Sequence, residues 1–124
     1  MVPWYRKVAL NMPDSGKIDD NFTALRKGLL EFAVLSTVSH SKVYAADILD
    51  KLATTPFATS EGTLYPLLSR LKRDGYLAYE WAESEAGPPR KYYSLTAEGK
   101  QRLAELHVYW NDLYKSLEAL GGKQ

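Results

Sequence analysis

The apolar residues of this chain change their spacing abruptly after residue 75. Before that point, four leucines recur with the spacing of one helical face, at positions 64, 67, 68 and 71. Asp74-Gly75 then ends this helix, because glycine is favoured just past a helix C-terminus. From Leu77 to Leu95, apolar and polar residues alternate in two runs separated by a loop at 85–89 that is rich in glycine and proline, as in a β-hairpin. A helix that leads at once into a hairpin restricts the chain to a small α+β fold.

Two further helices are expected before this change of spacing. The first spans about residues 23–39, with Asp20 or Asn21 as its N-cap, and the second covers about residues 44–53. A turn at residues 54–57 leads from the second helix to the third helix, which carries the four leucines. Three helices followed by a hairpin are typical of a winged helix-turn-helix.

The third helix is expected to begin near Thr59 or Ser60, because both residue types are favoured at a helix N-terminus. Pro66 lies inside it, where a proline removes a backbone hydrogen bond and costs roughly 3 kcal/mol. We therefore expect either a local kink at this proline or a helix that begins only near Tyr65.

A final helix carries the most regular apolar pattern in the sequence. Thr96 is its expected N-cap, and the helix runs from Ala97 to about Leu120, before two glycines. Its apolar residues are spaced alternately by three and four positions, which is the a/d spacing of a coiled coil, over about two and a half heptads. This a/d seam consists of Leu103, Leu106, Trp110, Leu113, Leu117 and Leu120.

Two interpretations of the a/d seam are open. In one, the amphipathic helix folds back on its own domain; in the other, the last helices of two protomers pack against each other and against the partner's first helix. The first helix favours the second interpretation, because it is apolar around nearly its whole circumference and must be covered on more than one side. We therefore expect a homodimer whose interface contains Leu29, Phe32 and the a/d seam.

The composition excludes several classes of protein. The 124 residues include no cysteine, so neither a disulfide framework nor a thiolate metal site is available. No apolar run approaches the roughly 18 residues of a membrane span, and the N-terminus lacks the apolar stretch of a signal peptide, so we expect a cytoplasmic protein with no membrane partner. The net charge is only +1, so a nucleic-acid site must come from local basic clusters.

Basic and hydroxyl-bearing residues gather where a winged helix would meet DNA. Opposite its leucines, the third helix presents small, hydroxylated and basic residues, which allow a close approach to phosphates and base edges. Two further pairs of basic residues lie at the start of the first helix and just after the hairpin loop. The candidate DNA-binding residues are Arg26, Lys27, Ser60, Thr63, Tyr65, Ser69, Arg70, Arg73, Arg90 and Lys91. Each cluster alone is equally consistent with an ordinary solvated surface, and their coincidence favours DNA.

The sequence contains no arrangement of residues that indicates an enzyme. The only two histidines, His40 and His107, have no partner at the spacing of a metal site or a catalytic triad. No glycine-rich phosphate loop is present, and the closely spaced acids fall in the N-terminal arm and in the hairpin. We expect no catalytic residue, no metal and no cofactor.

Three runs of residues resemble the PadR family of bacterial transcriptional regulators. They are RKGLL at 26–30, SEGTLYPLLSRL at 60–71 and GPPRKYYSLTAEG at 87–99. The resemblance covers about residues 24–120, and the single last helix resembles the short subfamily. It implies a dimeric winged-helix repressor that binds a palindromic operator in double-stranded DNA and is released by a small molecule, often an aromatic or planar hydrophobic one.

The same resemblance suggests where an effector would bind. In drug-sensing members, a flat cavity between the protomers is lined by aromatic residues of the last helix, and Trp110 resembles the matching position. The candidate effector-binding residues are therefore Phe32, Tyr109, Trp110 and Tyr114. Aromatic faces stack on planar ligands, although aromatics at helical spacing are equally consistent with a dimer core.

The predicted organisation is a flexible N-terminal arm at 1–20, a winged helix-turn-helix DNA-binding domain at 21–96 and a dimerisation helix at 97–120. The fold class is mainly α with a small β-hairpin. A different function remains open, because a winged helix with a near-neutral charge is also consistent with a protein–protein assembly module that binds no DNA.

Overall fold

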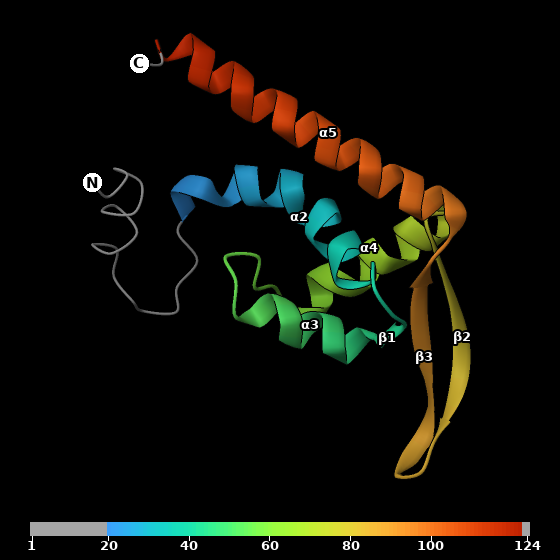
Figure 1. Cartoon of the computed structure of the whole chain (residues 1–124). Coiled ribbons are helices and arrows are strands. Elements are labelled where there is room, and N and C mark those ends of the chain that lie inside the picture. The colour runs from blue at the N-terminus through green and yellow to red at the C-terminus, as the bar shows by residue number, and fades with distance from the viewer. Residues whose placement is uncertain (1–19, 123–124) are drawn as a thin grey trace.

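The computed structural model describes residues 20–122. The flexible arm predicted for residues 1–20 lies outside the described residues except for its last position. In chain order the elements are η1 (Asp20–Phe22), α2 (Thr23–Thr37), β1 (Val43–Tyr44), α3 (Ala45–Ala53), α4 (Glu61–Arg73), β2 (Leu77–Ser84), β3 (Gly87–Leu95) and α5 (Ala97–Leu120) (Figure 1). This is the α+β winged helix-turn-helix that the sequence predicted, with α3 and α4 as the helix-turn-helix and β2–β3 as the wing.

The sheet has one more strand than the alternation of residues predicted. Its three antiparallel strands lie in the order β1-β3-β2, with Tyr93 of β3 opposite both Val43 and Tyr79. β1 contains only two residues, and a periodicity of two cannot be recognised over so short a stretch. The pairing joins the turn after α2 to the base of the wing, so the wing starts from a fixed position.

The first helix begins at Thr23 as predicted but with a different N-cap, and the second begins one residue later than predicted. The N-cap of α2 is Phe22, the last residue of the short helix η1, so the expected caps Asp20 and Asn21 are wrong. α3 begins at Ala45 rather than Tyr44, because the Tyr44 backbone is extended and pairs in the sheet. The Tyr44 N–H donates to Asp47 Oδ2 at 3.2 Å, which satisfies one of the amides that a helix start leaves free.

The third helix begins at Glu61 and continues through Pro66, so a start near Tyr65 is wrong. Ser60 is the N-cap, and its Oγ accepts a hydrogen bond from the Thr63 N–H at 3.3 Å. Proline is tolerated here because the only bond it removes is the one to the Gly62 carbonyl. Gly62 and Pro66 are both exposed, so water can replace that bond.

The core lies between α2, α3, α4 and the base of the sheet. Three leucines of the predicted α4 stripe, Leu64, Leu68 and Leu71, are at most 1% exposed, and the fourth, Leu67, is partly buried against the core. The apolar start of α2 is not part of it, since Leu25 is 60% exposed in the single protomer. The remaining buried core residues are Val34, Leu35, Val38, Val43, Ile48, Leu52, Leu77 and Tyr93.

The hairpin turn is shorter than the predicted loop at 85–89. Only Glu85 and Ala86 form the turn, and Gly87–Leu95 forms β3, in which Gly87 pairs with Ser84. Arg90 and Lys91 consequently lie in mid-strand opposite Ala82 and Trp81, not at the tip of the wing. The prolines are accommodated because this end of β3 has a neighbouring strand on one side only.

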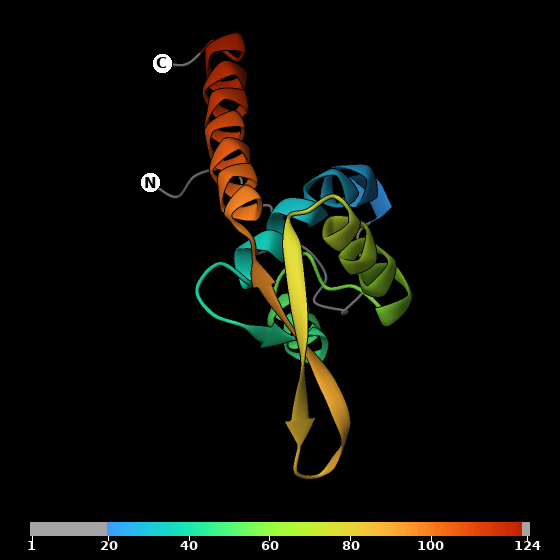
Figure 2. The ribbon, with the colours of Figure 1, turned by 90° about the vertical axis from the view of Figure 1, so that its right-hand side faces the viewer.

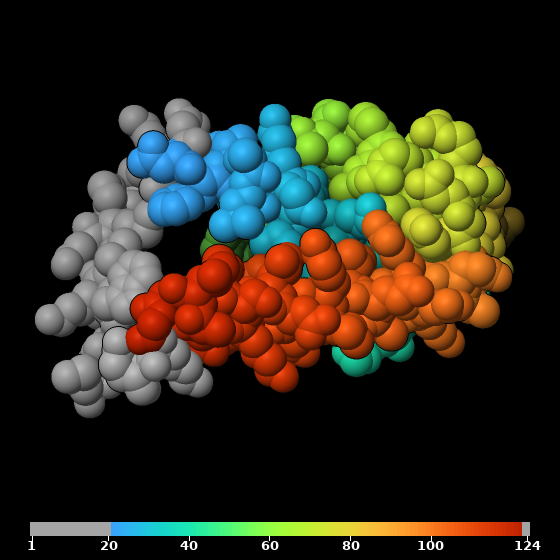
Figure 3. All heavy atoms as spheres, turned by 90° about the horizontal axis from the view of Figure 1, so that it is seen from above, coloured from blue at the N-terminus to red at the C-terminus, as the bar shows by residue number. Residues whose placement is uncertain are grey.

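The last helix runs from Ala97 to Leu120 as predicted, and the Thr96 hydroxyl caps it by accepting from the Gly99 N–H at 2.9 Å. Its first turns dock on the base of the hairpin, where Gly99 approaches the Tyr76 carbonyl. The helix then extends along α2 (Figure 3), while the hairpin projects from the opposite side of the domain (Figure 2). The wing and the C-terminal half of α5 are therefore the two projecting parts of the protomer.

Candidate nucleic-acid interface

The face of α4 that looks away from the core is open to solvent. Of the predicted residues, Ser60 at the N-cap and Thr63, Ser69 and Arg73 on the helix are exposed, and Tyr65 is 42% exposed. Because the buried leucines fix the rotation of the helix, Tyr65, Ser69 and Arg73 share one exposed side of it, and Thr63 lies on the other side of Leu64. A regular helix with short polar side chains at its N-terminal end can approach the edges of base pairs.

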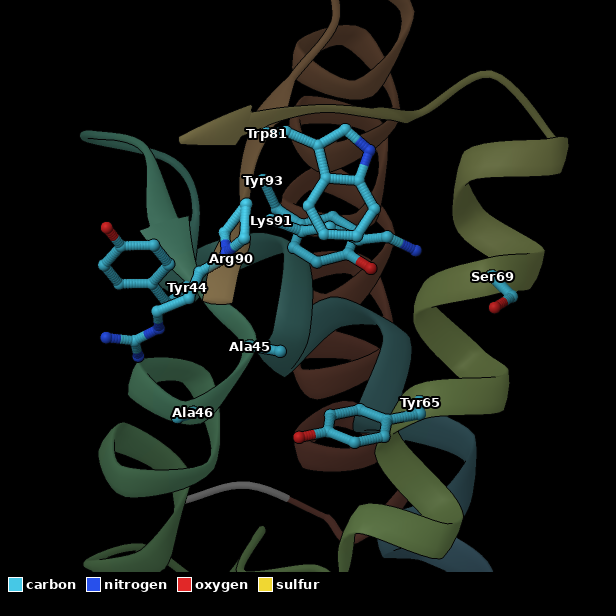
Figure 4. Close-up of a pocket in the computed structure, with 10 residues that line it drawn as sticks. Tyr44, Ala45, Ala46, Tyr65, Ser69, Trp81, Arg90, Lys91 and Tyr93 are labelled. Atoms are coloured by element: carbon cyan, nitrogen blue, oxygen red, sulfur yellow. The ribbon is translucent and has the colours of Figure 1, made fainter. Parts of the chain in front are cut away.

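A groove of about 390 Å³ lies between α4 and the wing. Figure 4 shows Tyr65 and Ser69 reaching it from α4, and Trp81, Lys91 and Tyr93 reaching it from the hairpin. Helix and hairpin thus form two walls of one concave surface. Because one wall carries hydroxyl groups and the other a lysine beside aromatic rings, the groove suits a polar, anionic ligand with flat parts.

Arg90 and Lys91 are adjacent in sequence but lie on opposite faces of the sheet, because side chains alternate along a strand. The Lys91 Nζ lies 4.4 Å from the centre of the Tyr79 ring and 5.4 Å from that of Trp81, on the face toward α4. The Arg90 guanidinium lies on the other face, 3.7 Å over the Tyr44 ring. The two basic residues therefore cannot bind the same part of a ligand.

The Tyr44 ring is itself stacked on Tyr92, with centroids 4.0 Å apart and planes 19° from parallel. A hydrogen bond to Tyr92, together with burial, raises the pKa of Tyr44, while the nearby Arg90 charge acts in the opposite direction. The Tyr44 ring, backed by Tyr92, thus supports the Arg90 guanidinium at the edge of the wing.

Arg70 is already engaged within the protein. Its guanidinium pairs with Glu31 of α2 and with Asp74, each at 3.3 Å, so this predicted DNA contact is turned toward α2. Arg26 and Lys27 lie on α2, whose N-terminal end is remote from the hairpin tip, and neither lines the groove. The Arg26 side chain donates to Thr23 Oγ1 at 3.2 Å. The structure therefore brings Tyr65, Ser69 and Lys91 together in the groove, which Arg90 lines from the other face of the sheet, and leaves Arg26, Lys27 and Arg70 outside it.

Three residues of this surface were not identified from the sequence. Trp81 is 62% exposed although it shares a strand face with the buried Leu77, because the hairpin extends beyond the core as it leaves the domain. Tyr79 lies between them, and Lys72 of α4 is 5.3 Å from its ring. The register of the hairpin would have identified the two aromatic residues. It pairs Trp81 with Lys91 and so places Tyr79 and Trp81 on the face of the sheet that carries this lysine.

The a/d seam of α5 divides into two parts. Leu103 and Leu106 pack against the core of their own domain, and Phe32 contacts His107 edge to face at 4.7 Å, with Leu29 half-buried one turn earlier on α2. The rest of the seam is uncovered in the protomer: Trp110 is 40%, Leu113 39%, Leu117 66% and Leu120 84% exposed. Tyr109 and Tyr114, the flanking aromatic residues, are 63% and 52% exposed.

Neither a metal site nor a membrane span is found among residues 20–122. No group of three or more histidine, cysteine or acidic residues there is placed to hold a metal ion. None of the helices in this part of the chain has the length and hydropathy required to span a bilayer.

The sequence matches the profile of the Transcriptional regulator PadR-like family over residues 34–105. It is 30% identical over 98 residues to a transcriptional regulator of Mycobacterium tuberculosis, an alignment that covers 79% of this chain and 89% of that protein. A solved PadR-like transcription factor from Bacteroides fragilis is 44% identical, with 82% of this chain and 99% of that chain covered and a TM-score of 0.71. A PadR family transcriptional regulator from Eggerthella lenta is 32% identical, with 94% and 95% covered and a TM-score of 0.73.

Proposed function

Because this chain belongs to the PadR-like family of transcriptional regulators, a family of DNA-binding regulators and not of enzymes, we propose that it is a homodimeric, ligand-responsive repressor. In this proposal it binds a palindromic operator in the cytoplasm, and a small aromatic or planar hydrophobic effector releases it. The main structural support for DNA binding is the groove between α4 and the wing, because it combines an exposed helix face with a basic hairpin.

Each part of the DNA surface has its own role in the proposal. Thr63 and Tyr65 read base edges in the major groove, because they lie in the first turns of the recognition helix. Ser60, Ser69, Arg73 and Lys91 bind the sugar-phosphate backbone, which positions the helix without reading sequence. Arg90 contacts the backbone from the outer face of the wing, while Arg26 and Lys27 contact flanking DNA.

Dimerisation is supported by the uncovered half of α5. An apolar stripe that includes side chains up to 84% exposed is unfavourable in water, and a second copy of the same helix has the matching a/d spacing to cover it. In the proposed dimer, Trp110, Leu113, Leu117 and Leu120 meet the partner's α5 and α2, where Leu29 and Phe32 lie. A two-fold axis through this interface makes the operator palindromic, with half-sites about one helical turn of DNA apart.

The effector site is proposed at the same interface, among Phe32, Tyr109, Trp110 and Tyr114. The two tyrosines and the tryptophan are all at least 40% exposed in the protomer, so their rings are accessible until a partner or a ligand covers them. Planar hydrophobic ligands would stack on the Trp110 indole and quench its fluorescence. The variant Trp110→Phe keeps Trp4 and Trp81 as its only tryptophans. If the ligand quenches the fluorescence of this variant as much as that of the wild type, the ligand binds elsewhere.

The function is tested by binding of the purified protein to DNA from upstream of its own gene, titrated with salt against unrelated duplex. Selective binding that weakens steeply with salt is expected, because displaced counterions give protein–phosphate contacts this dependence. If the own-gene fragment is not preferred, a genomic fragment library is screened for a distant operator. If no duplex is selected, the repressor proposal is wrong.

The alternative is a winged-helix assembly module without DNA binding, and the observation that favours it is the net charge of only +1. Failure to select any duplex, together with a salt-independent protein complex, would support this alternative. Repression itself is tested by transcription in vitro from a promoter containing the selected operator. Added protein is expected to reduce the transcript, whereas an increase would identify an activator.

A further inference from the structure

A second, smaller hollow of about 240 Å³ adjoins the groove beside the last two turns of α4. It shares Ser69, Lys91 and Tyr93 with the larger groove, so the two hollows form one continuous depression between helix and wing. Lys72, Arg73 and Tyr79 complete its polar lining. The hollow is therefore bounded by the C-terminal half of α4 on one side and by both strands of the hairpin on the other.

The side chains of this hollow have a single sign of charge. Lys72 reaches it from α4 and Lys91 from β3, and both ammonium groups lie over the same Tyr79 ring, at 5.3 and 4.4 Å from its centre. Arg73 adds a third cation, and no acidic residue is among the described residues that line the hollow. The face of an aromatic ring holds an ammonium group in place without neutralising its charge.

These three cations also differ from Arg70 and Arg102, which are already paired with an acidic residue. Arg70 and Arg102 are bound to the Glu31 carboxylate, whereas Lys72, Arg73 and Lys91 form no ion pair with any acidic group within residues 20–122. Like charges held close together repel one another, so their convergence is favourable only when an anion joins them. The Ser69 hydroxyl and the tyrosine phenols add uncharged donors that suit an anion with several oxygen atoms.

We propose that this hollow is a seat for one phosphodiester group of duplex DNA, held by Lys72 of α4 and Lys91 of the wing at the same time. The inference rests on the proposed DNA binding and deepens it by assigning Lys72, which the sequence did not indicate. A phosphate bound here fixes the distance between the backbone and the recognition helix and draws the hairpin toward α4. The seat carries no sequence information, because every nucleotide presents the same phosphate.

The seat is tested with the selected operator and four variants: Lys72→Gln, Lys91→Gln, the double variant, and Lys115→Gln as a control on the exposed surface of α5. Each single variant is expected to weaken binding of all duplexes by about the same factor, roughly fivefold at 0.15 M salt, and the control is expected to bind normally. The plot of log K against log salt has a negative slope. In the double variant the magnitude of this slope should decrease by only about 0.9, the value for one phosphate. Two separate contacts would lower it by twice as much.

Uncharged methylphosphonate linkages placed one at a time along the operator identify the phosphate directly. At one backbone position per half-site, the substitution should weaken the wild type most, each single lysine variant less, and the double variant hardly at all. Reduced sensitivity of Lys72→Gln and Lys91→Gln at different positions would overturn the seat. Normal DNA binding by both variants would also overturn it, and is the result expected of a hollow that takes only free phosphate. If a Gln variant has a lower melting temperature than the wild type, Lys72→Met or Lys91→Met is used in its place. If the wild type itself selects no duplex, the DNA-binding proposal fails, and the seat with it.

Discussion

The Glu31 carboxylate on α2 accepts a hydrogen bond from Arg102 Nε on α5 at 2.8 Å. Its other oxygen accepts from Arg70 of α4 at 3.3 Å, so one carboxylate joins α2, α4 and α5. The Glu31 side chain is only 16% exposed, and its hydrogen bond raises the pKa of the Arg102 guanidinium. The position of α4 is thus tied to the helix that we propose as the dimer interface.

Replacing Glu31 by Gln is expected to lower the free energy of unfolding by about 1–2 kcal/mol, because two arginines lose a charged partner that is largely shielded from water. Denaturant unfolding at fixed protein concentration measures this loss. The matched control is Lys42→Gln, which removes an ion pair to Glu80 between side chains 56% and 59% exposed and should change stability by less than about 0.5 kcal/mol. Equal effects of the two substitutions would contradict the role assigned to Glu31.

Gly99→Ala is expected to destabilise the protein by at least about 2 kcal/mol, because the added Cβ would lie 2.0 Å from the Tyr76 carbonyl oxygen. The matched control is Gly28→Ala on α2, where no atom lies within 4 Å of the added Cβ. There alanine should stabilise the helix by roughly 0.5–1 kcal/mol. Thermal melts of both variants would reveal the opposite signs, and a harmless Gly99→Ala would show that α5 does not dock so closely on the hairpin base.

Tyr93 should contribute to unfolding at high pH. Burial is the main cause that raises its pKa above the ordinary value of 10.0, with Tyr79 and Tyr65 adding to the effect. The unfolded chain therefore loses this proton first, so the stabilisation from the neutral phenol is complete below pH 10 and is lost as the pH rises through the folded pKa. The stability of Tyr93→Phe should fall less than that of the wild type above pH 10; parallel curves would assign alkaline unfolding to other groups.

A charge on the a/d seam is expected to separate the proposed dimer. Leu117→Glu places a carboxylate in the interface, which should shift the mass measured by sedimentation from dimer to monomer at micromolar concentration. Val108→Glu is the control, because the two residues are similarly exposed, at 66% and 61%, but nine positions apart on a helix they face opposite directions. Dissociation by Val108→Glu but not by Leu117→Glu would place the interface on the other side of α5.

Tyr65→Phe is expected to change which operator sequences are preferred, since the phenol lies on the exposed side of α4 and an altered base contact is worth about 1–3 kcal/mol. Selection from a randomised operator library compares the preferences of variant and wild type. Arg90→Gln is the contrasting substitution, because a lost backbone contact should weaken all sequences about equally. If Tyr65→Phe binds every sequence equally weakly instead, Tyr65 contacts the backbone and not the bases.

The sequence by itself determined the local structure around α4, the hairpin and α5. The stripe of leucines, the alternation from Leu77 to Leu95 and the caps Ser60 and Thr96 all depend on residues within a few positions of one another. Such patterns can be read directly from a chain because helix and strand periods repeat locally. Two of the three family motifs, at 60–71 and 87–99, also lie within these elements and the third lies in α2, so the regulator class was recognisable without coordinates.

Only the tertiary structure decided which distant side chains meet. β1 exists because Val43 and Tyr44 find partners on β3, about fifty residues later in the chain. Arg70 is turned away from the proposed DNA surface by Glu31, and Lys72 and Lys91 both lie over the Tyr79 ring, although Arg70 is far from Glu31 and Lys72 far from Lys91 in sequence. The physical reason is that helix rotation and strand register are set by burial of the shared core, and these two quantities decide which charges are paired and which remain available to a ligand.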